Sequence, residues 1–86
     1  MDFRDTYFNI WKSAWDFHKQ FADMAGTDKE WETVVNTSGE MVERYKNKPG
    51  YAFMKALILA ILDELERVDK QRQTQEDKEN EKKIQD

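Results

Sequence analysis

Helix-breaking residues are scarce in this chain, and their positions constrain the fold more than any other feature. The 86 residues include only three glycines and one proline. Gly26 follows one segment with helical periodicity, and Pro49 with Gly50 separates a second such segment from a third. Because the connections are short, consecutive helices should run antiparallel. The sequence therefore predicts an all-α fold, an antiparallel three-helix bundle.

The start of the second helix has a specific signature. Thr27 and Glu30 have the spacing of a capping box, in which each side chain accepts a hydrogen bond from the backbone of the other residue. Residues placed about 100° apart put apolar side chains on one side of each segment. The first helix, expected from about residue 3 to residue 25, has an apolar arc that includes Trp11 and covers about half of its circumference. That arc predicts packing against two neighbours.

One packing layer follows from the expected register. If the antiparallel turns are centred near Gly26 and Pro49, the side chains of Trp15, Ser38 and Ala60 fall at about the same level of the bundle. A large indole facing two small side chains is a reasonable core layer. We therefore expect Trp15 to contribute to the core as well as to the margin of its helix.

The third segment contains the most apolar run, from Ala52 to Leu62, interrupted by Lys55. This run is well short of the ~20 apolar residues that span a bilayer, so it is predicted to be a core helix and no membrane partner is expected. The chain begins without the basic start and apolar stretch of a signal peptide. With no cysteine in the chain, a cytoplasmic location is expected. A formal net charge of −4, with both signs interspersed, argues against nucleic acid as a partner.

The composition changes after residue 68. The last 18 residues, DKQRQTQEDKENEKKIQD, contain one aliphatic side chain, Ile84, among many charged ones. Such a segment buries too little apolar surface to offset its ordering entropy. We therefore divide the chain into a three-helix bundle, residues 1–68, and a charged C-terminal tail, residues 69–86, which is helical or disordered.

Four carboxylates suggest one kind of enzyme. Glu40 and Glu43, then Glu66 and Asp69, have a spacing similar to the magnesium motif of all-α nucleotide pyrophosphohydrolases. The expected register displaces the second pair along the bundle axis by roughly 12 Å, at about 1.5 Å per residue. The first pair also points away from the apolar face of its helix. We therefore expect no metal site, no cofactor and no catalytic residues, and keep the pyrophosphohydrolase as a remote alternative.

His18, the only histidine, lies near the centre of the apolar arc of the first helix. A histidine in this position is a catalytic base, a pH-sensitive group or a core side chain satisfied by one acceptor. The register places Glu64 close to it, which predicts a buried hydrogen bond between His18 and Glu64. No serine or cysteine is arranged beside His18 as a catalytic triad requires.

Aromatic residues are frequent in the first helix, and some lie outside the predicted core. Phe8 and Trp15 lie at one margin of the apolar arc, and Leu59 lies on the back of the third helix near Leu62. Uncovered apolar surface on a small domain often marks a protein interface. We therefore predict a non-catalytic protein–protein interaction module that forms homodimers through these four residues. The alternative is an acidic inhibitor or regulator whose negative exterior complements a basic host protein.

Four short segments carry a resemblance. They are Trp15–His18 (WDFH), Thr27–Trp31 (TDKEW), Ser38–Glu40 (SGE) and Leu57–Arg67 (LILAILDELER). The chain resembles, over this region, a group of small, uncharacterised helical proteins of Gram-positive gut bacteria that are often encoded by prophages or mobile elements. The resemblance implies a bacterial protein and no particular activity, so it assigns no functional residue.

Overall fold

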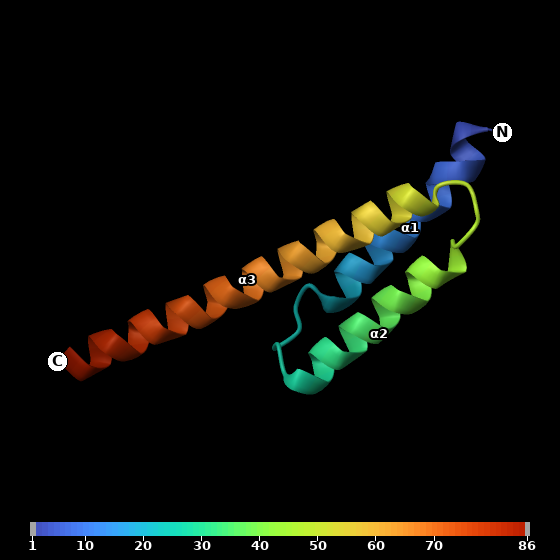
Figure 1. The fold of residues 1–86 in the computed structure, drawn as a ribbon. Helices are drawn as coiled ribbons and strands as arrows, with labels where there is room; N and C mark the ends of the chain where they lie inside the picture. The colour runs from blue at the N-terminus through green and yellow to red at the C-terminus, as the bar shows by residue number, and fades with distance from the viewer. Residues whose placement is uncertain (1, 86) are drawn as a thin grey trace.

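The computed structural model describes the backbone of residues 2–85 and the side chains of residues 2–72. Three helices follow one another: α1 (Phe3–Phe21), α2 (Asp28–Arg44) and α3 (Tyr51–Gln85). The helices α1 and α3 run in the same direction and α2 runs back beside them (Figure 1). No strand occurs in the described backbone. The predicted all-α fold with antiparallel consecutive helices is therefore confirmed.

The two helix connections contain the residues that the sequence suggested. Gly26 and Gly50 have φ angles of 90° and 85°, in the left-handed region that favours glycine. Asn47, which precedes Pro49, has a φ of 64° and is the one non-glycine residue with a positive φ in the described chain. Backbone hydrogen bonds tighten the second connection, including one from the Tyr51 N–H to the Lys48 carbonyl at 3.2 Å. These turns are why α2 returns along α1 and α3 returns along α2.

The predicted capping box at the start of α2 is confirmed. The Glu30 N–H donates to Thr27 Oγ1 at 3.1 Å, and the Thr27 N–H donates to Glu30 Oε1 at 3.0 Å. The same carboxylate also accepts from the Gly26 N–H at 3.0 Å and from the Ala25 N–H at 3.3 Å. These contacts lower the pKa of Glu30, and the hydrogen bond from the Thr27 backbone contributes most. The Glu30 side chain thus holds residues 25–27 of the α1–α2 connection.

All three helices contribute to a single apolar core. α3 packs closely against both α1 and α2, which makes it the central helix of the bundle. Ser38 is the buried polar residue among them, and its hydroxyl donates to the Val35 carbonyl at 2.8 Å, so its burial leaves no donor unsatisfied. The buried apolar residues are Ile10, Ala14, Phe17, Phe21, Val34, Met41, Met54, Ile58, Ile61 and Leu65.

Two expectations for the core are wrong. Trp15 is 67% exposed and Ala60 is also exposed, so neither forms a layer with the buried Ser38. Trp11, placed in the apolar arc of the first helix, is 54% exposed. The reason is that the apolar arc of α1 is wider than the surface that the other two helices cover.

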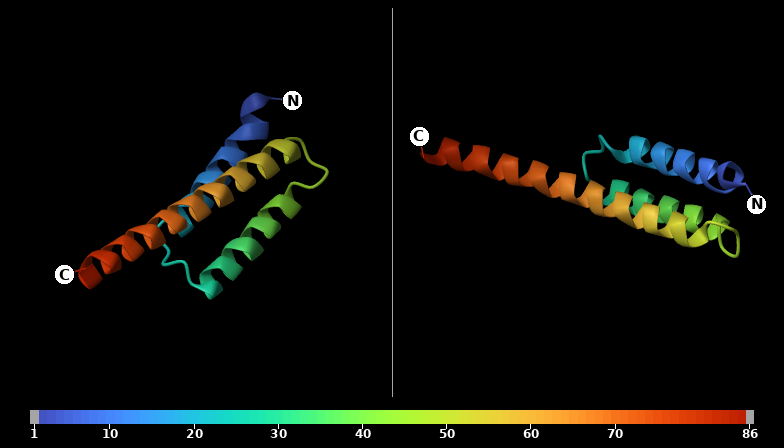
Figure 2. Two further views of the ribbon diagram at one scale, coloured as in Figure 1. Left: turned by 60° about the vertical axis from the view of Figure 1, so that its left-hand side comes forward. Right: turned by 90° about the horizontal axis from the view of Figure 1, so that it is seen from above.

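α3 is much longer than its neighbours and continues past the end of the bundle (Figure 2). It crosses the expected boundary between residues 68 and 69 without interruption, so the helical form of the tail is the one observed. The molecule is elongated as a result, with extents of 64 × 23 × 17 Å.

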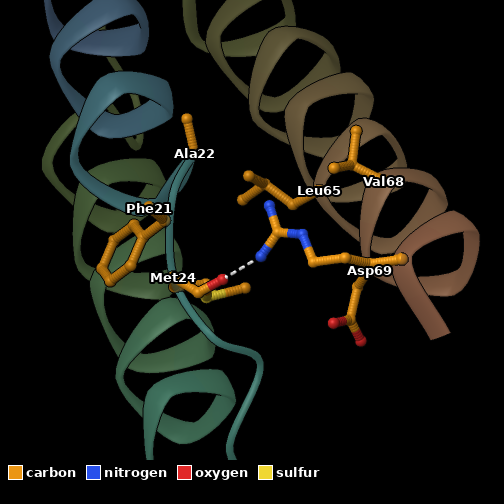
Figure 3. Close-up of a pocket in the computed structure, with 7 residues that line it drawn as sticks. Phe21, Ala22, Met24, Leu65, Val68 and Asp69 are labelled. Atoms are coloured by element: carbon orange, nitrogen blue, oxygen red, sulfur yellow. Dashed lines mark hydrogen bonds between the residues drawn. The ribbon is translucent and has the colours of Figure 1, made fainter. Parts of the chain in front are cut away.

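The first turn after the expected boundary is joined to the bundle. The guanidinium of Arg72 donates to the carbonyl of Met24, just beyond the end of α1, at 2.6 Å. Figure 3 shows this hydrogen bond as a dashed line that ends at Met24. Asp69, from the same turn, lies so close to Gly26 that a side chain on Gly26 would overlap its carboxylate. The base of the tail therefore stabilises the α1–α2 connection.

Candidate interaction surface

α1 carries a row of exposed aromatic side chains. Phe8, Trp11 and Trp15 are 53%, 54% and 67% exposed, and they follow one another at spacings of three and four residues. His18 and Ala22, both half-buried, continue the same spacing toward the end of the helix. We call these five residues the α1 seam.

The α1 seam exists because α1 has two apolar rows. The buried residues Ile10, Ala14, Phe17 and Phe21 each precede a residue of the seam by one position. Successive residues of a helix are rotated by about 100°, so the two rows run side by side along α1 and face different directions. One row packs in the core, and the other is left at the surface. The helix therefore has the apolar surface for one more neighbour than the chain provides.

Aromatic contacts hold one end of the α1 seam in place. The rings of Trp11 and Phe53 pack edge to face with centroids 5.3 Å apart, and Tyr7 contacts Phe53 in a similar way. The guanidinium of Arg4 lies over the ring of Phe8 at 5.4 Å from its centroid. These contacts fix the aromatic side chains on α1 and against α3 without covering them. Such fixed surfaces lose little side-chain entropy when they bind.

The other end of the α1 seam is hollowed. Trp15, His18, Lys19 and Ala22 line an open depression of about 230 Å³. Its wall is mainly apolar, apart from the imidazole and the ammonium group. A shallow apolar depression beside an exposed indole is suited to receive a protruding aromatic or aliphatic side chain.

The expected buried hydrogen bond between His18 and Glu64 is not formed. Both residues are half-buried, and the Glu64 carboxylate instead accepts two hydrogen bonds from Arg67, one of them from Nε at 2.9 Å. Arg67 lies three residues along the same helix, so it reaches Glu64 without any cross-helix constraint. The Arg67 hydrogen bonds lower the pKa of Glu64, and the charge of His18 adds a smaller contribution. His18 is thus an electrostatic neighbour of Glu64 at the edge of the seam.

A second apolar hollow lies between α2 and α3. Trp31, Val35 and Leu62 line it together with charged residues of α3, and it is an open hollow of about 480 Å³. Leu59, one turn before Leu62, is 52% exposed. Around α3, Leu62 is rotated by about 180° from Phe53, at about 100° per residue. Since Phe53 borders the α1 seam, Leu62 faces away from it.

The four predicted interface residues therefore belong to two surfaces. Phe8 and Trp15 lie in the α1 seam, whereas Leu62 lines the hollow between α2 and α3 and Leu59 is exposed one turn before it on α3. Trp11, expected in the apolar arc that packs against the other helices, joins the first group. A signal for it was present, because Phe8, Trp11 and Trp15 share the spacing of a coiled-coil seam.

The four carboxylates that suggested a magnesium site stay apart. Glu40 and Glu43 line a shallow hollow on α2 beside Arg44, whereas Glu66 and Asp69 line the hollow between α2 and α3. Glu66 also pairs with Lys70 at 3.2 Å. Among the side chains that the structure describes, no three acidic or histidine groups are close enough together to hold a metal ion.

Within the described residues, none of the three helices combines the length and the apolar character needed to cross a bilayer. No protein-family model, curated protein or solved structure matches this chain.

Proposed function

We propose that this protein is a non-catalytic helical interaction module that associates with a second copy of itself. The observation that supports this proposal is the α1 seam, where Phe8, Trp11 and Trp15 are each more than half exposed. Aromatic residues, and tryptophan above all, dominate the binding energy of protein interfaces. Three such side chains on one helix face are costly to leave in water.

The size of the seam fits an interface. With about 200 Å² for each fully exposed aromatic side chain, the three rings present roughly 350 Å² per copy. A typical stable interface buries about 800 Å² on each partner. The three aromatic side chains alone account for nearly half of that area, and the residues around them supply surface for the rest.

The small size of the bundle gives a reason for association. A domain of this length buries only about 60% of the surface that its unfolded chain exposes, and it gains stability when a partner covers more. Association links folding to concentration, because a ligand that binds only the folded state stabilises it. Self-association therefore protects the exposed aromatic side chains and the fold together.

The test is the solution mass of the full chain, measured by light scattering from about 1 µM to 1 mM, the range of weak to moderate affinities. The proposal expects a dimer whose population rises with concentration. Trp15→Glu should shift the chain to the monomer without loss of helical circular dichroism, since the side chain is 67% exposed. Val35→Glu is the matched control, because Val35 is 61% exposed on another surface.

Two outcomes would contradict the proposal. A wild-type chain that stays monomeric throughout would exclude self-association, and a different protein on the α1 seam would then be the better candidate. A dimer that survives Trp15→Glu but is lost with Val35→Glu would place the interface at the hollow between α2 and α3.

A further inference from the structure

We infer that the two copies pair through their α1 helices in antiparallel orientation, with the α1 seams in contact. This inference rests on the proposed self-association and adds its geometry. It follows from two features of α1, the spacing of the seam and the charges along its outer edge.

The spacing gives the packing layers. Residues that alternate at three and four positions form a straight apolar row on a helix, and two such rows interlock when the helices cross at a small angle. In antiparallel orientation, Trp11 lies opposite Trp15 of the second copy, and the two-fold axis repeats this pair. Phe8 then lies opposite His18 of the second copy, beside the hollow that Trp15, His18, Lys19 and Ala22 line. The four indoles meet at the centre of the interface.

The charges select the orientation. Asp5, Lys12 and Lys19 are seven residues apart, so they lie in a row along the outer edge of the seam. All three are exposed. In the part of the chain that the structure describes, Asp5 and Lys19 form no ion pair.

Antiparallel pairing brings these ends together. Asp5 of each copy then lies within two residues, or about 3 Å along the axis, of the level of Lys19 of the other copy, which allows two opposite-charge contacts, while Lys12 lies near only its own counterpart. Parallel pairing would place the charged rows of the two copies on opposite sides of the helix pair, so Asp5 and Lys19 would form no contacts between the copies. Only the antiparallel arrangement therefore gives Asp5 and Lys19 opposite-charge contacts, which favour that orientation.

A reciprocal charge exchange tests the orientation. Lys19→Glu alone places a glutamate near Asp5 at each of the two symmetric contacts. Because two weak ion pairs become repulsive, the dimer dissociation constant should rise roughly tenfold at low salt. Asp5→Lys alone should have a similar effect. The double variant, with Asp5→Lys and Lys19→Glu, should restore the wild-type constant, and the single-variant effects should shrink in 1 M salt, where charges are screened. Sedimentation or light scattering of the full chain measures all four proteins.

The outcomes separate this inference from the proposed function. A dissociation constant that returns to the wild-type value in the double variant supports the antiparallel pair. If the wild type is a dimer that Trp15→Glu dissociates, but the double variant is no tighter than either single variant, the antiparallel orientation is wrong and self-association through the seam still stands. If the wild type is monomeric at every concentration, both ideas fail. Gln20→Glu, an exposed change on the same helix away from the charged row, is the control and should leave the constant unchanged.

Discussion

Replacement of Gly50 by alanine should strongly destabilise the bundle, for two reasons that can be measured separately. The residue has a φ of 85°, where a side chain costs about 1–2 kcal/mol. An added Cβ would also lie 2.5 Å from Cδ1 of Ile10. Ile10 is 0% exposed, so the end of its side chain has no free space to move into. Overpacking of a tight core costs about 1–3 kcal/mol more.

The two contributions together predict a loss of about 2–5 kcal/mol in the free energy of unfolding. For a domain of this size each kcal/mol lowers Tm by about 4–8 °C, so Tm should fall by about 8–40 °C. Gly39→Ala is the matched control. Gly39 lies inside α2, and an added Cβ would have no neighbour within 4 Å, so alanine should stabilise the protein by about 0.5–1 kcal/mol.

A double-mutant cycle separates strain from overlap. Ile10→Val removes Cδ1, and the nearest remaining atom to the new Cβ would be Cγ2 of Thr6 at an ordinary 3.5 Å. In the valine background, Gly50→Ala should therefore cost only the backbone contribution of about 1–2 kcal/mol. The assay is thermal unfolding followed by circular dichroism at one fixed protein concentration. An equal cost in both backgrounds would refute the predicted overlap, and an unchanged Tm would refute the whole argument.

Two further predictions concern the α1–α2 connection. The pKa of Glu30 is lowered below its ordinary 4.5, so its stabilising effect is complete above that pH and is lost as the pH falls through the folded-state pKa. Wild-type Tm should therefore fall faster on acidification below pH ~4.5 than that of Glu30→Gln, and parallel curves would contradict the capping role. Arg72→Gln removes the hydrogen bond to the Met24 carbonyl and should cost about 1 kcal/mol in urea unfolding. Arg67→Gln, whose partner lies on the same exposed helix face, should cost less; the opposite order would show that the base of the tail does not stabilise the bundle.

The outline of the fold could be predicted because its signals are local. The positions of Gly26 and Gly50 separate the helices, and the capping box depends on two residues three positions apart. Helical periodicity also identifies the buried row of α1 and the burial of Ser38.

The surface could be predicted only in part, because its features depend on how each helix is rotated against the others. The width of the apolar arc of α1 was visible, but periodicity does not say which half α3 covers. Trp11 and Trp15, which were expected to pack against the other helices, therefore lie at the surface. The pairing of Glu64 was missed for a related reason: Arg67, three residues away, competes more effectively than His18 on another helix.

The length of α3 determines the shape of any assembly that forms through α1. Because α3 runs parallel to α1 and extends beyond the bundle, antiparallel pairing would send the two C-terminal helices out in opposite directions. Each α3 extends roughly 40 Å from the level of Trp15 to its C-terminal end, at about 1.5 Å per residue. The two C-terminal ends would therefore lie roughly 80 Å apart. The dimer would then be a rod with a compact aromatic centre and a charged arm at each end, a molecular spacer rather than a globule.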